Sequence, residues 1–336
     1  MMQYSEIGIP PRSDHLWRYT QWNRIHPTDV LKVPSATEIR FSDGEEASME
    51  GSDEIARSFI HQASNISRKL SLNDNETTLD IHCGGDICAG ELNVVSKGES
   101  SLIITISGNP GWVGLRVVGE VEGSLSIALI NNLAADSYFL RCEDWEVGRD
   151  STLEFSTLSS GGFLVKSDIR VDLSAQGSEI RGGIATHGHN SRHDDHHVEI
   201  SHTVGNTQSS LVMHAACGDS SHSVGTGLLT IAEGANASDA GQVFRNLLLS
   251  EKARAEAIPE LEVLADDVKA AHGAASSPID QEQIHYLASR GLSPSQAEAI
   301  IVEGFLMDAF REIKNQSVID ALRTRLLVHL DCLTTG

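Results

Sequence analysis

Short runs of apolar residues recur throughout residues 77–275, and each run ends at glycine, serine, asparagine or aspartate. They recur about every 10–20 residues with no long helical pattern between them, which is typical of many short strands joined by turns. Examples are Leu102–Ile106, Leu125–Ile130, Ile169–Leu173, Val198–Ile200 and Leu228–Ile231. No Asn-Gly or Asp-Gly pair marks a two-residue hairpin turn in this region. The pattern predicts a mainly β fold, either an antiparallel sandwich or a β-solenoid of stacked coils.

The residues on either side of this β region have different patterns. Residues 1–75 are mixed and polar, with a loose helical spacing of apolar residues over Glu54–Leu70. The residues after 276 have a helical spacing instead. We therefore expect three parts: a small mixed or helical N-terminal region (1–75), a β region (76–276) and a C-terminal helical domain (277–336).

The last 60 or so residues predict three helices with clear ends. The first, Ile279–Arg290, is followed by Gly291, the residue type favoured just after a helix. The second begins with Ser293–Gln296, which supplies a serine cap, a proline in the first turn and the glutamine of a capping box. A third apolar stripe begins at Ser317. These local signals predict a small all-helical unit at this end of the sequence.

Composition limits the functions that the chain can carry. Its 336 residues, 40% of them hydrophobic, suffice for one large core, and the formal net charge is −22. Nucleic acids and anionic membranes attract basic proteins, so we expect no nucleic-acid partner and no membrane partner. Met1–Pro11 lacks the basic and apolar parts of a secretion signal, and no apolar run is long enough to span a bilayer. The expected location is cytoplasmic.

The sequence contains no common catalytic motif. Gly-x-Ser-x-Gly, a phosphate-binding loop and His-Glu-x-x-His are all missing. The chain is therefore not expected to be an enzyme, and nucleotide chemistry would have to come from another chain. A β-helix carbohydrate-active enzyme stays open as an alternative. Such enzymes use carboxylates beside aromatic platforms, whereas aromatic residues make up only 5% of this sequence.

The five cysteines are an odd set for a chain without a secretion signal, so disulfides are not expected. Cys83 and Cys88 are separated by four residues and could be half of a metal site. A single such pair is more typical of small buried side chains, which is the role we expect for them.

A second cluster joins histidine and aspartate. Eight potential metal ligands lie within sixteen residues: His187, His189, His193, Asp194, Asp195, His196, His197 and His202. Strand alternation places His196 and His202 on the face of Val198, and His197 on the opposite face, so the eight cannot form one site. Residues 187–195 are expected to be a solvated surface loop, and His202 a hydrogen-bonded core histidine. A histidine-rich metal-binding module remains the other alternative.

Four linked motifs lie between Phe244 and Gly291. They read RNLLLSEKA (Arg245–Ala253), IPELEV (Ile258–Val263), ADDVKAAHGA (Ala265–Ala274) and YLASRG (Tyr286–Gly291). In this order they closely resemble the SufB/SufD family, scaffold components of iron–sulfur cluster assembly. Asp195–His202 is similar to a further strand of that family, and Trp17–Thr20 (WRYT) is similar to the N-terminal motif of its SufD-type members.

The resemblance implies a fold and a set of partners. The implied fold is mainly β: a right-handed parallel β-helix between a small N-terminal region and a C-terminal helical domain. The implied partners are a SufB-like scaffold, in a heterodimer, or a second copy in a homodimer, paired through the β-helices. A SufC-like ABC-type ATPase would bind the C-terminal helices. No cofactor is expected to bind tightly to the chain alone, and a transient iron–sulfur cluster or iron would lie at the partner interface.

The resemblance also singles out His272. It matches the histidine that SufD-type members are thought to contribute across the interface, so His272 is the tentative iron ligand, with His202 and His196 as secondary candidates. The SufB branch has cysteine at the position of Ala253 and glutamate at that of Gly273. Because thiolates and carboxylates bind iron, their absence predicts that this chain cannot hold a cluster alone.

The tail helices are expected to provide the docking face. Their apolar stripes exceed what two short helices can bury against each other, so part of the apolar surface should meet a partner. The expected docking residues are Tyr286, Arg290, Ile300, Ile301 and Phe305.

Overall fold

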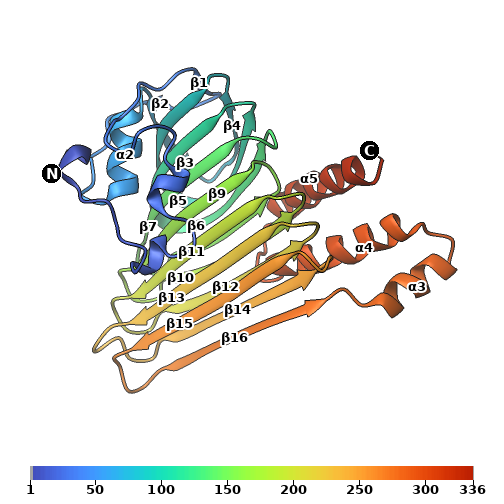
Figure 1. Ribbon diagram of the computed structural model, residues 1–336. Coiled ribbons are helices and arrows are strands. Elements are labelled where there is room, and N and C mark those ends of the chain that lie inside the picture. Colours follow the sequence, from blue (N-terminus) through green and yellow to red (C-terminus); the bar gives the residue numbers. More distant parts are fainter. Residues whose placement is uncertain (1–2, 336) are drawn as a thin grey trace.

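A computed structural model describes residues 3–335, and a parallel β-helix forms its body (Figure 1). Two parallel sheets face each other across the core. One sheet contains β7 (Tyr138–Val147), β9 (Leu164–Leu173), β11 (His193–His202), β13 (His222–Ile231) and β15 (Arg254–Val263). The other contains β8 (Thr152–Ser159), β10 (Glu179–Gly188), β12 (Gln208–Cys217), β14 (Asp239–Leu248) and β16 (Lys269–Pro278). Each strand pairs in parallel with the strand one coil away, which confirms the solenoid and excludes the sandwich.

Two long strands connect the two sheets at the N-terminal end. These are β5 (Ile87–Gly108) and β6 (Trp112–Leu133). The first half of β6 pairs with β7 and its second half with β8, so this strand turns the corner between the sheets. The turn falls at Gly123, which lies opposite Gly98 and has φ +111°; a Cβ at Gly123 would lie 2.3 Å from the Gly98 carbonyl oxygen. Only glycine fits that corner.

The first coil is built by shorter strands. β3 (Ser67–Asn73) and β4 (Glu76–Cys83) pair in parallel with β5. Their outer edges are covered by antiparallel pairing with β2 (Glu45–Glu46) and β1 (Ile39–Phe41). The N-terminal end of the solenoid is thus capped by strands of its own chain, which pair with the edges of both β3 and β4.

The N-terminal region packs on the outer face of the first sheet (Figure 1). Its elements are η1 (Tyr4–Glu6), η2 (His15–Trp17), α1 (Trp22–Ile25) and α2 (Ile55–Ala63). Tyr4, Trp17, Trp22 and Phe59 form an aromatic core against Leu140 and Leu164 of the sheet. The helix predicted over Glu54–Leu70 was too long: it ends at Ala63, and β3 begins four residues later because Ile66–Leu72 joins the solenoid core.

The C-terminal helices are α3 (Gln281–Ser289), α4 (Pro294–Met307), η3 (Asp308–Phe310) and α5 (Gln316–Thr335). The last three pack on the outer face of the solenoid, whereas α3 packs against α4 and lies beyond the ends of the strands (Figure 1). The predicted signals are confirmed: Gly291 has φ +98°, and the Ser293–Gln296 capping box is formed. The helices and the sheet share one apolar core, which includes Val212, Leu306 and Leu322. Within residues 3–335 no helix is both long and apolar enough to cross a membrane.

This shared core changes the expectation for the tail. Much of the apolar surface of α4 and α5 contacts the β-helix, so it is not free to meet a partner. The part of this surface that was expected to meet a partner is reduced, because the sheet covers it through contacts between segments far apart in the sequence, such as those of Ser317 with Glu76 and Arg325 with Asn132.

Candidate functional site

The last coil of the solenoid is open. Strand β15 pairs only with β13, and β16 only with β14, so among the described residues both sheets end in a free edge (Figure 1). The strands of the middle coils are buried on both faces, whereas nearly every residue of β15 and β16 is half-buried or exposed. Apolar side chains are exposed to solvent at this end: Val263 is 40% exposed and Leu264 is 59% exposed. Free edges beside apolar surface are typical of strand-to-strand association.

His272 lies on this open coil. It is exposed and stands opposite Gln242 of β14, and its imidazole has no hydrogen-bond partner among residues 3–335. A Cβ on the adjacent Gly273 would meet nothing within 4 Å, so the space beside the imidazole is open. A donor without an internal partner, on an uncovered strand, can meet a group supplied by another chain.

Ala253 does not lie beside His272. It is buried in the turn before β15, against Ala215 and Cys217 at the corner where β12 ends. His272 is near the start of β16, and the two strands run in opposite directions around the coil, so these two positions lie toward opposite corners. The structure therefore separates the two positions that the sequence motifs had singled out.

The histidine cluster is not a solvated loop. Asp194 and Asp195 are at most 1% exposed, and His187 and His193 are also buried. The prediction for residues 187–195 was wrong because β10 extends to Gly188 and β11 begins at His193, leaving only a short turn between them. The N-terminal region then covers β11 from outside, as the hydrogen bond between Thr20 Oγ1 and His193 Nε2 (2.9 Å) shows.

The two secondary candidates are held inside the core. His196 Nδ1 lies 2.6 Å from Ser167 Oγ, and both ring nitrogens of His202 are bonded, to Thr207 Oγ1 (2.6 Å) and Ser209 Oγ (2.8 Å). His202 is thus the hydrogen-bonded core histidine that was expected, and it has no free nitrogen for a metal. His196 and His202 share the inner face, whereas His197 points outward, as strand alternation predicted.

Buried neutral histidines should make stability depend on pH. Burial lowers the pKa of His193 and of His202 to about 4, below the value of about 6.5 in an unfolded chain. Between these values the unfolded state binds more protons, so stability is complete above pH 6.5 and is lost as the pH falls toward 4. At pH 5 we expect each histidine to cost about 2 kcal/mol relative to pH 7.5, measured by urea unfolding.

His202→Gln should flatten this pH dependence, because the amide can replace one hydrogen bond and does not titrate. The exposed His285 is the matched control, and His285→Gln should leave the pH profile unchanged. An identical profile for His202→Gln and the unsubstituted chain would contradict the assignment.

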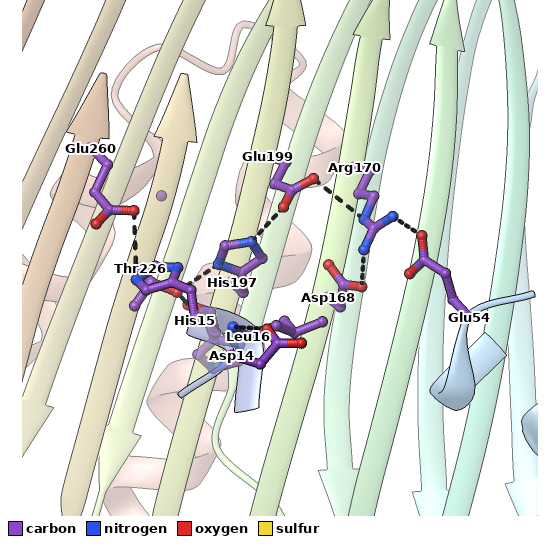
Figure 2. Close-up of polar contacts among 12 residues, drawn as sticks. Asp14, His15, Leu16, Glu54, Asp168, Arg170, His197, Glu199, Thr226 and Glu260 are labelled. Carbon is purple, nitrogen blue, oxygen red and sulfur yellow. Dashed lines mark hydrogen bonds and ion pairs between the residues drawn. The ribbon is translucent and has the colours of Figure 1, made fainter. Parts of the chain in front are cut away.

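A pocket of about 500 Å³ lies where the N-terminal region meets the outer face of the first sheet. Figure 2 shows a chain of polar contacts along it. His15 contacts Glu260 (3.5 Å), His197 contacts Glu199 (3.0 Å), and Arg170 reaches Glu199 (3.4 Å), Asp168 (3.2 Å) and Glu54. The contacts join η2 and the start of α2 to β9, β11 and β15.

The charges in this pocket are suited to ion pairs that hold the N-terminal region on the sheet, and not to acid catalysis. The hydrogen bond from His197 lowers the pKa of Glu199; burial opposes ionisation of Asp168, but Arg57 and Arg170 bring its pKa below the usual value. A glycosidase needs one carboxyl group with a raised pKa as its general acid. Asp168 and Glu199 are shifted in the opposite direction, so neither supports the carbohydrate-active alternative.

The expected docking residues divide into two groups. Tyr286 (57% exposed), Arg290 and Ile300 (47% exposed) are on the surface, and the Arg290 guanidinium lies over the Tyr286 ring at 4.9 Å. Ile301 and Phe305 are half-buried against the core shared with the sheet. A groove of about 430 Å³ between α3 and α4 is lined by Tyr286, Leu287 and Ile301.

All five cysteines are free thiols, and Cys332 alone is exposed. Cys83 and Cys88 lie inside the first coil, as small buried side chains were expected to do. The hydrogen bond between them raises the pKa of Cys83 and, with further backbone donors, lowers that of Cys88 to about 7.

Three sets of buried polar contacts were missed by the sequence analysis. Arg57 bonds Asp144 and Asp168, Lys166 bonds Asp195, and His329 of α5 meets His187. No local pattern marks these pairs, since their partners are 29–142 residues apart in the sequence.

These features define a parallel β-helix protein with one closed end, one open end and a helical flank. Residues 113–305 match the family model described as "SUF system FeS cluster assembly, SufBD core domain". The match covers more than half of the chain, and the chain belongs to this SufBD family of iron–sulfur cluster assembly proteins.

Similarity to individual relatives indicates the same family. The chain is 27% identical over 250 residues to an iron-sulfur cluster assembly SufBD family protein of Mycobacterium leprae, covering 72% of this chain and 63% of that protein. It is 28% identical over 216 residues to the iron-sulfur cluster assembly protein SufD of Bacillus subtilis (62% and 49%), and 26% identical over 190 residues to SufD of Escherichia coli (56% and 45%). The chain thus spans less than two thirds of these relatives.

Proposed function

We propose that the chain is a non-catalytic, SufD-type component of an iron–sulfur cluster assembly complex in the cytoplasm. It would pair with a SufB-like scaffold through the open coil of its β-helix and bind a SufC-like ATPase through α3 and α4. The observation that carries the proposal is the pair of free sheet edges at β15 and β16, bordered by exposed apolar side chains. Uncovered edges of this length are normally protected in a protein that works alone.

The charge of the last coil favours pairing with a different chain over pairing with a second copy of this chain. Residues 254–278 contain five carboxylates and two strongly basic residues, Arg254 and Lys269. A twofold pairing of two such edges would bring like charges together, which is destabilising. A scaffold chain of the same fold with a more basic edge would complete both sheets without that penalty.

The ATPase surface would centre on the groove between α3 and α4. Tyr286, stacked under Arg290, gives an exposed aromatic and cationic pair at this groove, and such residues dominate binding energy at protein interfaces. Ile300 of α4 adds an exposed apolar side chain to the helical flank. The neighbouring Phe305, whose ring stacks on His214 of β12, would hold α4 on the β-helix and so fix the orientation of this surface.

Two substitutions should separate the two interfaces. In cells that express all three chains, Leu264→Asp should weaken recovery of the SufB-like partner, because it places a charge in the apolar edge. Ile300→Asp should weaken recovery of the ATPase. We expect about tenfold lower yield of the affected partner in each pull-down, the effect of about 1.4 kcal/mol.

Leu31→Asp is the matched control, since Leu31 is 73% exposed on the N-terminal region, away from both surfaces. It should leave both partners bound. Equal loss of both partners in all three variants would show that the substitutions act through stability. Full recovery of both partners by Leu264→Asp and Ile300→Asp would contradict the proposal.

A further inference from the structure

Three histidines converge where α5 crosses the corner of the β-helix. His187 is the penultimate residue of β10, His189 begins the turn that follows, and His329 comes from α5. One ring nitrogen from each lies within 4.8 Å of the other two. The contact between His187 Nδ1 and His329 Nε2 is 2.9 Å, and the His189 ring lies 5.3 Å from that of His329 and 6.0 Å from that of His187.

The surrounding structure holds two of the rings before any ligand binds. His187 and His329 are 5% and 8% exposed. The turn that carries His189 is fixed by bonds from the Asn190 amide to Asp219 (2.7 Å) and from the Arg192 amide to the His189 carbonyl (3.2 Å). Nδ1 of His189 is buried without a hydrogen-bond partner in the described structure. A buried ring nitrogen left unsatisfied beside two others is costly unless something binds it.

We propose that His187, His189 and His329 form a binding site for a divalent transition-metal ion of the Zn²⁺ type. A tetrahedral ion with metal–nitrogen bonds of about 2.0–2.1 Å needs its nitrogens about 3.3 Å apart. The three nitrogens lie within 4.8 Å of one another, so ring rotations that bring them up to about 1.5 Å closer would reach this spacing. Three imidazoles leave a fourth position, which water can fill because His189 is only half-buried and Asn190 beside it is exposed.

The chemistry of the donors selects the class of ion. Imidazole suits Zn²⁺, Fe²⁺, Ni²⁺ and Cu²⁺, whereas Mg²⁺ and Ca²⁺ need oxygen ligands. His187 and His329 are both buried, and burial favours the neutral imidazole, which is the form that binds a metal.

The charges nearest the cluster largely cancel. Arg192 and Arg325 both oppose a cation here. Arg192 is paired with Asp194 through two contacts of 2.6 Å, and the Asp219 carboxylate lies on the other side of the turn, so two acidic groups balance the two basic ones. The local field therefore does not prevent a divalent ion from entering.

Occupancy would tie the C-terminal helix to the solenoid. Two ligands belong to the β-helix and one to α5, so an ion would add a cross-link between segments 142 residues apart. Since α5 packs against α4, the ion would also steady the helical flank as a whole. This role is independent of cluster assembly and concerns a metal that stays with the protein.

The test uses the full chain without a histidine tag, freed of metal by a chelator. We expect one Zn²⁺ per chain by calorimetry, a rise in melting temperature, and slower hydrogen exchange in α5 when Zn²⁺ is present. Co²⁺ in its place should give the strong visible absorption of tetrahedral nitrogen coordination. Mg²⁺ should have none of these effects.

His329→Gln and His189→Gln should each lower Zn²⁺ affinity by at least about 10–100-fold, the loss that even an outer-shell change causes at metal sites. His285→Gln, on the exposed face of α3, is the control and should bind as the unsubstituted chain does. If His329→Gln folds poorly, His189→Gln still tests the site, because His189 is only half-buried. Absence of one-to-one binding, or binding that survives both substitutions, overturns the proposal.

Discussion

Lys166→Ala should destabilise the chain by about 3–5 kcal/mol, the cost of leaving one member of a buried ion pair alone. Lys166 Nζ lies 3.0 Å from Asp195 Oδ1, and the two side chains are 1% and 2% exposed. The ammonium also lies over the Trp17 ring at 5.8 Å, so it ties the N-terminal region to β9 and β11. Removing the ammonium leaves the Asp195 carboxylate buried, without a counter-ion and without water. Urea unfolding followed by circular dichroism measures the loss.

A double substitution identifies the cause. Lys166→Met with Asp195→Leu removes both charges and keeps the apolar volume, so it should recover most of the stability lost by Lys166→Ala. Lys97→Ala is the control on a surface pair: Lys97 and Glu122 are 2.9 Å apart but 60% and 65% exposed, and the change should cost under about 1 kcal/mol. Equal losses for Lys97→Ala and Lys166→Ala would show that burial is not what matters.

Features that depend on neighbours in sequence could be predicted from the sequence. The capping box at Ser293 and the end of α3 at Gly291 are local hydrogen-bond and φ preferences, and both are present. The inward direction of His196 and His202 follows from strand alternation and is also present. The motif order between Phe244 and Gly291 indicated the family, which the match over residues 113–305 shows.

Features that depend on what covers a face could not be predicted. Polar residues 187–195 look solvated because nothing local shows that Thr20 of the N-terminal region packs over His193. The same holds for α5, whose His329 meets His187 only because the helix returns to the second sheet. Period-two alternation gives the two faces of a strand, but in a solenoid both faces can be buried, and the covering segment is far away in sequence.

His272→Ala should lower iron–sulfur cluster production in cells by about 10–100-fold while leaving the fold intact, if the chain acts as proposed. An exposed imidazole without an internal hydrogen-bond partner contributes little to stability, so unfolding should change by less than about 0.5 kcal/mol. Its position on the free edge strand makes the imidazole available to iron, or to a cluster, held jointly with the partner chain. The readout is the activity of a reporter iron–sulfur enzyme in cells that also express the two partners.

Two further variants distinguish ligation from a contact. His272→Cys keeps a metal-binding donor on the same edge and should restore part of the cluster production, whereas His272→Gln keeps only hydrogen bonding and should not. His82→Ala, an exposed histidine on β4 in the closed first coil, is the matched control and should have no effect. Recovery of the SufB-like partner and the ATPase must stay normal in all variants, so that a lost complex is not mistaken for a lost ligand. Full cluster production by a stably folded His272→Ala chain would remove this residue from the mechanism while leaving the two interfaces to be judged by the Leu264 and Ile300 variants.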